Sequence, residues 1–217
     1  MIKYENLSFQ WLGHDGFVVT AASGKKVCID PFKVEKHIEP VDIIISTHEH
    51  RDHCNPEDIK KFIGPKTQII AIHLAEQALH DIGAQVHYVK PGDLIEMQGI
   101  KVQAVPAYNT NKFREPGKPF HPKEDNKIGV VVEMDGTRFY HAGDTDHIPE
   151  MKDIETDVAL VPVSGTYVMT AEEALEAVKD INPKLAIPMH YGSIVGDDSM
   201  AKMFKEKASC PVELPQI

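Results

Sequence analysis

The segment Val41–His53 reads VDIIISTHEHRDH and decides the fold. Its first half is a short β-branched run, which is typical of a strand buried on both faces. His48, His50, Asp52 and His53 follow this strand directly. Residues two apart in an extended segment point the same way, so we expect His48 and His50 to bind one metal ion together. Asp52 and His53, at the turn that follows, can then face a neighbouring ion.

The chain around this segment alternates short strands with helices, which predicts a mixed α/β class. Asn55 and Pro56 follow the motif as an N-cap and a first helical residue, so a helix begins there. Thr170 and Glu173 form a capping box for a later helix. Further strands are expected at 68–72, 85–89, 100–105, 128–134, 137–141, 158–163 and 184–188, and further helices at 74–82, 170–180 and 198–208.

Length and composition bound the class of protein. The 217 residues, 42% of them hydrophobic, predict a single domain over 1–217 with a substantial core. The net charge of −10 argues against general nucleic-acid binding. No apolar run approaches the roughly 18–20 residues that span a membrane, so no membrane association is expected. Three widely spaced cysteines cannot form a disulfide framework, which indicates a reducing cytoplasm.

Two further candidate ligands stand where later strands end. Asp144 follows the strand 137–141 and could bridge two ions, although taken alone it is better explained as a capping aspartate after Gly143. His190 follows the strand 184–188, and a lone histidine there is more often a core or surface residue. Together with the first cluster, both become candidate metal ligands.

These motifs resemble those of the metallo-β-lactamase superfamily. The HxHxDH pattern at 48–53, the later Asp144 and the final His190 occur in that family's order. The resemblance covers essentially the whole chain and implies a four-layer αββα sandwich with the metal site along one edge. The opening segment Trp11–Phe17 also resembles the branch containing ascorbate-6-phosphate lactonase and the N-acyl-phosphatidylethanolamine phospholipase. No motif specifies the substrate.

The resemblance also implies two sets of ligands. His48, His50, Asp144 and a histidine of the third motif would hold the first ion. The second would be held by Asp52, His53, His190 and the shared Asp144. The chain departs from this pattern at the third motif, where Asn109 stands in place of histidine. An asparagine carbonyl is a weaker and harder ligand than imidazole, so the first site needs another donor or is the weaker one.

The loop 106–127 offers that donor. It has no helix or strand periodicity, and an irregular stretch of about 20 residues in a compact domain is usually functional. His121 lies between two prolines and could supply a ligand or a substrate contact, or simply belong to a rigid surface loop. The lysines and the arginine of this loop favour an anionic substrate, unless they only keep it solvated. His14 is either close to the metal ions or a structural histidine.

The sequence thus predicts a metal-dependent hydrolase with one or two divalent ions, zinc first and manganese, iron or nickel as alternatives. Asp52 would orient water or accept its proton, and His190 would stabilise charge on the leaving oxygen. We expect a small ester, lactone or phosphodiester substrate that carries negative charge, and homo-oligomers are possible. The alternatives are a non-catalytic metal-binding protein, a nuclease-type member and a diiron oxygen- or nitric-oxide-reducing member. The last would show His-x-Glu-x-Asp, whereas position 50 here is histidine.

Overall fold

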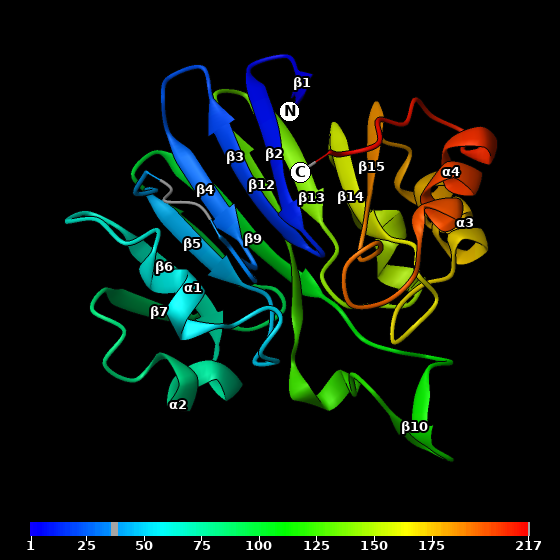
Figure 1. Cartoon of the computed structure of the whole chain (residues 1–217), viewed down its shortest axis with the longest axis horizontal. Coiled ribbons are helices and arrows are strands. Elements are labelled where there is room, and N and C mark those ends of the chain that lie inside the picture. The colour runs from blue at the N-terminus through cyan, green and yellow to red at the C-terminus, as the bar shows by residue number, and fades with distance from the viewer. Residues whose placement is uncertain (36–38, 217) are drawn as a thin grey trace.

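Two β-sheets face each other at the centre of the molecule (Figure 1). The computed structural model describes residues 1–35 and 39–216. The first sheet runs in chain order through β1 (Ile2–Tyr4), β2 (Leu7–Gly13), β3 (Gly16–Ala21), β4 (Lys26–Ile29), β5 (Ile43–Ser46), β6 (Gln68–Ile72) and β7 (Gln85–Val89). The second has the order β15 (Leu185–Met189), β14 (Val158–Pro162), β13 (Thr137–His141), β12 (Ile128–Met134), β9 (Ile100–Pro106) and β8 (Leu94–Met97).

Helices cover the outer face of each sheet. The short α1 (Pro56–Lys60) and α2 (Glu76–Leu79) lie against the first sheet, and α3 (Ala171–Ile181) and α4 (Asp198–Lys207) lie beside the second (Figure 1). The four-layer αββα sandwich is therefore confirmed. None of the helices in the described part of the chain is long and apolar enough to cross a membrane.

Strand β5 shows why the run of isoleucines predicts a doubly buried strand. Ile43 and Ile45 point into the core between the two sheets, whereas Ile44 packs with the residues under α1 and α2. All three side chains are fully buried because alternate residues of a strand face opposite sides. The strand is parallel to β4 and β6, so its carboxyl end delivers Thr47 and His48 to the edge of the sandwich.

The predicted helix starts are confirmed. Asn55 accepts hydrogen bonds from the backbone N–H groups of Glu57 and Asp58, and Pro56 is the first residue of α1. Thr170 and Glu173 complete the capping box of α3. The segment 74–82 differs from the expected continuous helix, since a 3₁₀ turn (His73–Ala75) precedes only four α-helical residues. The loop 106–127 contains a small hairpin, β10 (Phe113–Glu115) and β11 (Lys118–Pro119), which projects away from the sheets in Figure 1.

Candidate metal centre

Segments that are far apart in the sequence meet at one edge of the sandwich. They are the turn between β2 and β3, the segments that follow β5, β13 and β15, and the loop after β9. Side chains of these segments form three overlapping groups whose ligand atoms lie within 4.8 Å of one another. The groups consist of His48, His50 and His121; of His48, His53 and Asp144; and of His14, Asp15, His53 and His190.

The first histidine set joins the HxH motif to the loop 106–127. His48 Nε2 lies 3.0 Å from Nδ1 of His50, and the His121 ring lies 5.1 Å from each of the other two rings. His48 and His121 are buried, while His50 is partly exposed. Three convergent imidazoles with one open side are a common arrangement for a catalytic zinc ion.

Asp144 stands between the two sides of the centre. Its Oδ2 lies 3.4 Å from Nε2 of His121 and 4.0 Å from Nε2 of His48. Its Oδ1 faces the other way, at 3.4 Å from Nε2 of His53 and 3.5 Å from Nε2 of His190. One oxygen of the carboxylate is thus turned to each histidine set, which is the geometry of a bridging ligand.

Gly143 explains how Asp144 reaches this position. The chain turns at Gly143 with φ +63°, and a Cβ there would lie 2.7 Å from the carbonyl oxygen of Ile128. Only glycine combines the left-handed backbone with so close an approach. The turn directly after β13 therefore requires glycine at position 143, and it places Asp144 at the edge of the sandwich.

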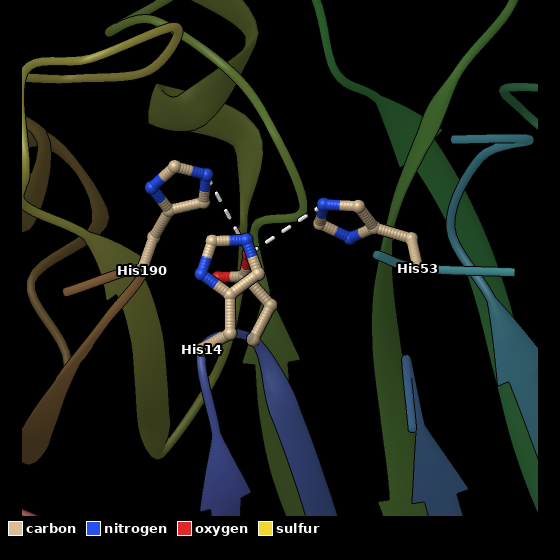
Figure 2. A group of neighbouring side chains, drawn as sticks. His14, His53 and His190 are labelled. Carbon is tan, nitrogen blue, oxygen red and sulfur yellow. Dashed lines mark ion pairs between the residues drawn. The ribbon is translucent and has the colours of Figure 1, made fainter. Parts of the chain in front are cut away.

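The second set surrounds the carboxylate of Asp15. His14, His53 and His190 point toward one another from three separate segments (Figure 2). Their Nε2 atoms lie 3.6, 3.7 and 3.8 Å, respectively, from Asp15 Oδ2. The His14 and His190 rings are 4.2 Å apart, so His14 belongs to the centre.

Outer hydrogen bonds orient the ligand rings. Asp30 Oδ2 accepts a hydrogen bond from Nδ1 of His53 at 2.8 Å. Thr47 donates its hydroxyl proton to Asp30, so its oxygen is left to accept from Nδ1 of His48 at 3.2 Å. These partners at Nδ1 turn the Nε2 atoms of His48 and His53 inward, as metal-binding histidines require. Ser164 Oγ lies 2.9 Å from Nδ1 of His190 and holds that ring in the same way.

Asn109 has a comparable role behind His121. Its Nδ2 donates to Asp146 and to the carbonyl of Tyr167, which fixes the orientation of the amide. Its Oδ1 therefore accepts from Nδ1 of His121, at 2.9 Å. The structure turns the Asn109 oxygen toward His121 and the Nε2 of His121 toward Asp144.

Asp52 lies at the opening of the second set, with its side chain 31% exposed. Its Oδ2 is 3.3 Å from Nε2 of His14 and 3.8 Å from Nε2 of His53. Although burial alone would raise the pKa of Asp52, the His14 hydrogen bond and the charge of His53 hold it well below its usual range. This carboxylate is ionised at neutral pH.

The pKa values of the histidines divide into two groups. Burial and the neighbouring His53 hold the pKa of His48 well below its usual range, and burial lowers that of His121 to about 4. Both rings are neutral at pH 7. Burial opposes protonation of His53 and His190 as well, but Asp144 and other nearby carboxylates raise the pKa of both rings. In the metal-free protein these two rings compensate the charge of Asp144.

The donor atoms fit metal ions. Nε2 of His53, Oδ1 of Asp144 and both oxygens of Asp15 are buried and have no hydrogen-bond partner among the described residues. Buried polar atoms without partners are rare because they cost free energy. Four such atoms in one cluster of imidazoles and carboxylates are explained by divalent ions that bind them.

A pocket of about 400 Å³ opens beside the first histidine set. His50 and Glu49 form its floor, and the hairpin β10–β11 contributes Arg114 and Lys118. Phe120 lines the same pocket, and the guanidinium of Arg114 lies over its ring at 5.4 Å. The loop 106–127 thus forms a wall of the cavity next to the candidate ligands.

Three residues of this site, Asp15, Asp30 and Ser164, are not predicted from the sequence. Asp15 lies in the segment Trp11–Phe17 but has no metal-ligand spacing, and Asp30 directly follows β4. Cys54, next to His53, is buried, and burial raises the pKa of its thiol to about 11. Among the histidines away from this centre, His73 and His80 are exposed, His87 is hydrogen-bonded to Gln68, and His37 lies outside the described residues.

Comparison with known proteins identifies the class. Residues 8–190 match the family described as Beta-lactamase superfamily domain, so the chain belongs to the metallo-β-lactamase superfamily. Within it, a UPF0173 metal-dependent hydrolase of Thermoplasma acidophilum is 35% identical over 98% of this chain and 97% of its own length. A second, from Pelotomaculum thermopropionicum, is 33% identical over 84% of this chain and 83% of its own length. The chain is therefore a member of the UPF0173 metal-dependent hydrolase family.

Solved structures agree with this placement. A protein of Parabacteroides distasonis described as a metal-dependent hydrolase superposes with a TM-score of 0.82 at 31% identity, covering 97% of this chain and 93% of its own. Igni18, a metallo hydrolase of Ignicoccus hospitalis, gives a TM-score of 0.76 at 25% identity, covering 96% and 94%. The enzyme class predicted from the sequence is thus confirmed.

Proposed function

We propose that this enzyme is a two-metal hydrolase that acts on a small ester, lactone or phosphodiester. The observation that carries the proposal is Asp144, which turns one carboxylate oxygen to each histidine set. In this assignment His48, His50 and His121 hold the first ion, and His53 and His190 hold the second beside Asp52. His121 takes the place of the third-motif histidine, which is replaced by Asn109 in this chain. Asn109 orients the His121 ring.

The donor types suit zinc first and manganese, iron or nickel as alternatives. Bound divalent ions would lower the pKa of water to about 7 and polarise the oxygen of the scissile bond. Asp52 is ionised, close to His53 and open to solvent, so it can orient a water molecule and accept its proton. His14 donates to Asp52 and keeps the carboxylate in place. His190 has its Nδ1 held by Ser164 and its Nε2 turned to Asp144 and Asp15, so it serves this proposal as a ligand of the second ion rather than as a direct contact of the leaving oxygen.

Arg114 in the pocket beside the hairpin β10–β11 favours a small substrate with an anionic group, although Glu124 and Asp125 line the same pocket. Glu49 is paired with Lys127, and Lys118 is paired with Glu115, so these charges are already compensated. Arg114 has no carboxylate partner among the described residues and only donates to the carbonyl of Phe120. Its guanidinium is the cation left to bind a carboxylate or phosphate of the substrate.

A panel of lactones, carboxylic esters and phosphodiesters, each in an anionic and a neutral form, tests this proposal with zinc and with manganese supplied. We expect the wild-type protein to hydrolyse one of these three substrate classes and the Asp144→Asn variant to hydrolyse none of them. Arg114→Ala should raise KM for the anionic form roughly tenfold and leave the neutral form unchanged. Lys118→Ala is the matched control, because its charge is already paired. No turnover above the Asp144→Asn background with both ions bound would overturn the proposal.

The partner, the cellular location, the nearer family branch and the oligomeric state are also part of this proposal. A small molecule is the proposed partner, rather than nucleic acid or membrane, because the net charge of −10 repels phosphate backbones. A cytoplasmic location is proposed from the three free cysteines, of which Cys28 and Cys54 are buried. The nearer likeness to the ascorbate-6-phosphate lactonase and phospholipase branch depends on the segment Trp11–Phe17, which supplies His14 and Asp15 to the centre. A homo-oligomer is also compatible with these observations.

A further inference from the structure

Asp15 is the most unusual carboxylate of this chain. It occupies the turn between β2 and β3, after His14, which adopts the left-handed backbone conformation (φ +51°). Its side chain is fully buried, and both of its oxygens lack a hydrogen-bond partner among residues 1–35 and 39–216. An ionised carboxylate in such a place is strongly unfavourable unless a cation compensates it.

The other buried aspartates of the described residues differ from Asp15 in their hydrogen-bond partners. Asp30 accepts hydrogen bonds from Thr47 and His53. Asp58 accepts from two backbone N–H groups and Lys61, and Asp146 accepts from the backbone of the loop after β9. Apart from Asp15, only Asp144 among the buried aspartates described has an oxygen without a donor. Asp15 therefore shares this property with the proposed bridging ligand.

The turn itself does not need the Asp15 side chain. The backbone carbonyl of Asp15 accepts a hydrogen bond from Nε2 of His141 at 2.9 Å. The carbonyl of His14 accepts from the indole of Trp11 and from the backbone N–H of His190. Main-chain atoms thus anchor the turn, and the carboxylate is free for another role.

We infer that Asp15 is a ligand of the second ion, which it binds together with His53 and His190. The inference rests on the metal centre proposed above. The Nε2 atoms of these two histidines lie 3.7 and 3.8 Å from Asp15 Oδ2, beyond hydrogen-bonding range. Donors of one tetrahedral ion, each about 2.1 Å from the metal, are themselves about 3.4 Å apart. The spacing therefore fits ligands of a shared ion better than hydrogen-bonded partners.

This assignment makes the two positions chemically different. Asp144 is shared by both positions, so the first combines it with three imidazoles, whereas the second combines it with two imidazoles and the carboxylate of Asp15. Carboxylate oxygens are harder donors and shift preference toward manganese or iron, while imidazole suits zinc. Asp15 would thus give the second position its preference for the harder ion.

Metal titration of the apoprotein tests the inference without an activity assay. Manganese and zinc are titrated into wild type, Asp15→Asn and Asp15→Ser, with stoichiometry from elemental analysis and the manganese EPR spectrum as a second readout. We expect both variants to bind manganese at the second position at least about tenfold more weakly and to keep zinc at the first. Asp58→Asn is the control, since it removes a satisfied buried carboxylate remote from the centre.

Two outcomes would overturn the inference. Unchanged manganese affinity in variants that melt like wild type would show that Asp15 is not a ligand. A lower melting temperature of the apoproteins with unchanged stoichiometry would show a structural role instead. Failure of wild type to bind a second ion is a separate result, which would refute the proposed metal centre itself.

Discussion

The side-chain oxygen of Asn109 lies 2.9 Å from Nδ1 of His121. Because Nδ2 of Asn109 donates to Asp146 and Tyr167, the oxygen has to be the acceptor of this hydrogen bond. The proton is thereby fixed on Nδ1 of His121, and Nε2 is left to bind a metal ion. The residue that breaks the family's ligand pattern orients another histidine for that task.

Asn109→Ala should therefore weaken metal binding at the first position by about ten- to a hundredfold, although Asn109 is not assigned as a ligand. His121→Ala should weaken it further, because it removes the ligand itself. Asn109→His should bring no gain, since the new ring would lose the hydrogen bonds that hold His121. Competition with a chromophoric chelator measures all three. A clear increase in zinc affinity for Asn109→His would show that position 109 faces the ion directly.

Asp52→Ala should abolish hydrolysis while leaving the fold intact. The carboxylate is partly exposed and bonds only to His14 among the described residues, so the stability change should stay within about 1 kcal/mol. Loss of a general base lowers kcat by about 10²- to 10⁴-fold. Turnover and thermal melting are measured together, with Glu124→Ala on the pocket wall as the control. Wild-type turnover by Asp52→Ala would mean that its role is assigned wrongly.

Residue types and spacing predict most of the fold and part of the centre. The isoleucines of β5 predict a strand that is buried on both faces. The HxHxDH pattern predicts metal ligands at the end of that strand. The role of Asn109 was not predictable, because it depends on Asp146 and Tyr167, which lie 37 and 58 residues away. Asp15 was missed for a similar reason, since its burial among three histidines arises only when both sheets meet.

Metal binding should release protons at pH 7. Nearby carboxylates raise the pKa of His53 and His190 above the ordinary value, which favours the protonated rings in the metal-free enzyme, although burial opposes this. A bound ion needs neutral imidazole and displaces these protons. The affinity for the metal ion should therefore rise with pH until the pH exceeds the raised pKa values of His53 and His190. Calorimetry in buffers of different ionisation enthalpy should give observed enthalpies that depend on the buffer; identical enthalpies would argue against this charge state.

The ion pair of Glu49 and Lys127 should contribute to stability rather than to catalysis. The ammonium of Lys127 is buried, and Glu49→Gln should lower the free energy of unfolding by about 1–3 kcal/mol. Burial alone would raise the pKa of Glu49, but the Lys127 hydrogen bond lowers it below its usual value. The contribution is therefore present above the unfolded pKa of about 4.3 and is lost as the pH falls through the lower folded value.

Urea unfolding at pH 7 and at pH 3 measures this contribution, with the Glu49→Gln/Lys127→Met double variant as the control. The double variant should recover part of the loss, because no charge is left buried without a partner. A difference between wild type and Glu49→Gln that does not shrink at low pH would exclude the ion pair as its cause.

The central claim is a two-ion centre bridged by Asp144, and metal stoichiometry tests it most directly. Wild type and the His48→Ala/His50→Ala variant are loaded with zinc or manganese, freed of excess ion and measured by elemental analysis. The account predicts two ions per chain in wild type and one in the variant, which keeps His53, His190 and Asp144 for the second position. A variant that retains the full wild-type content, or a wild type that never binds more than one ion, would contradict it.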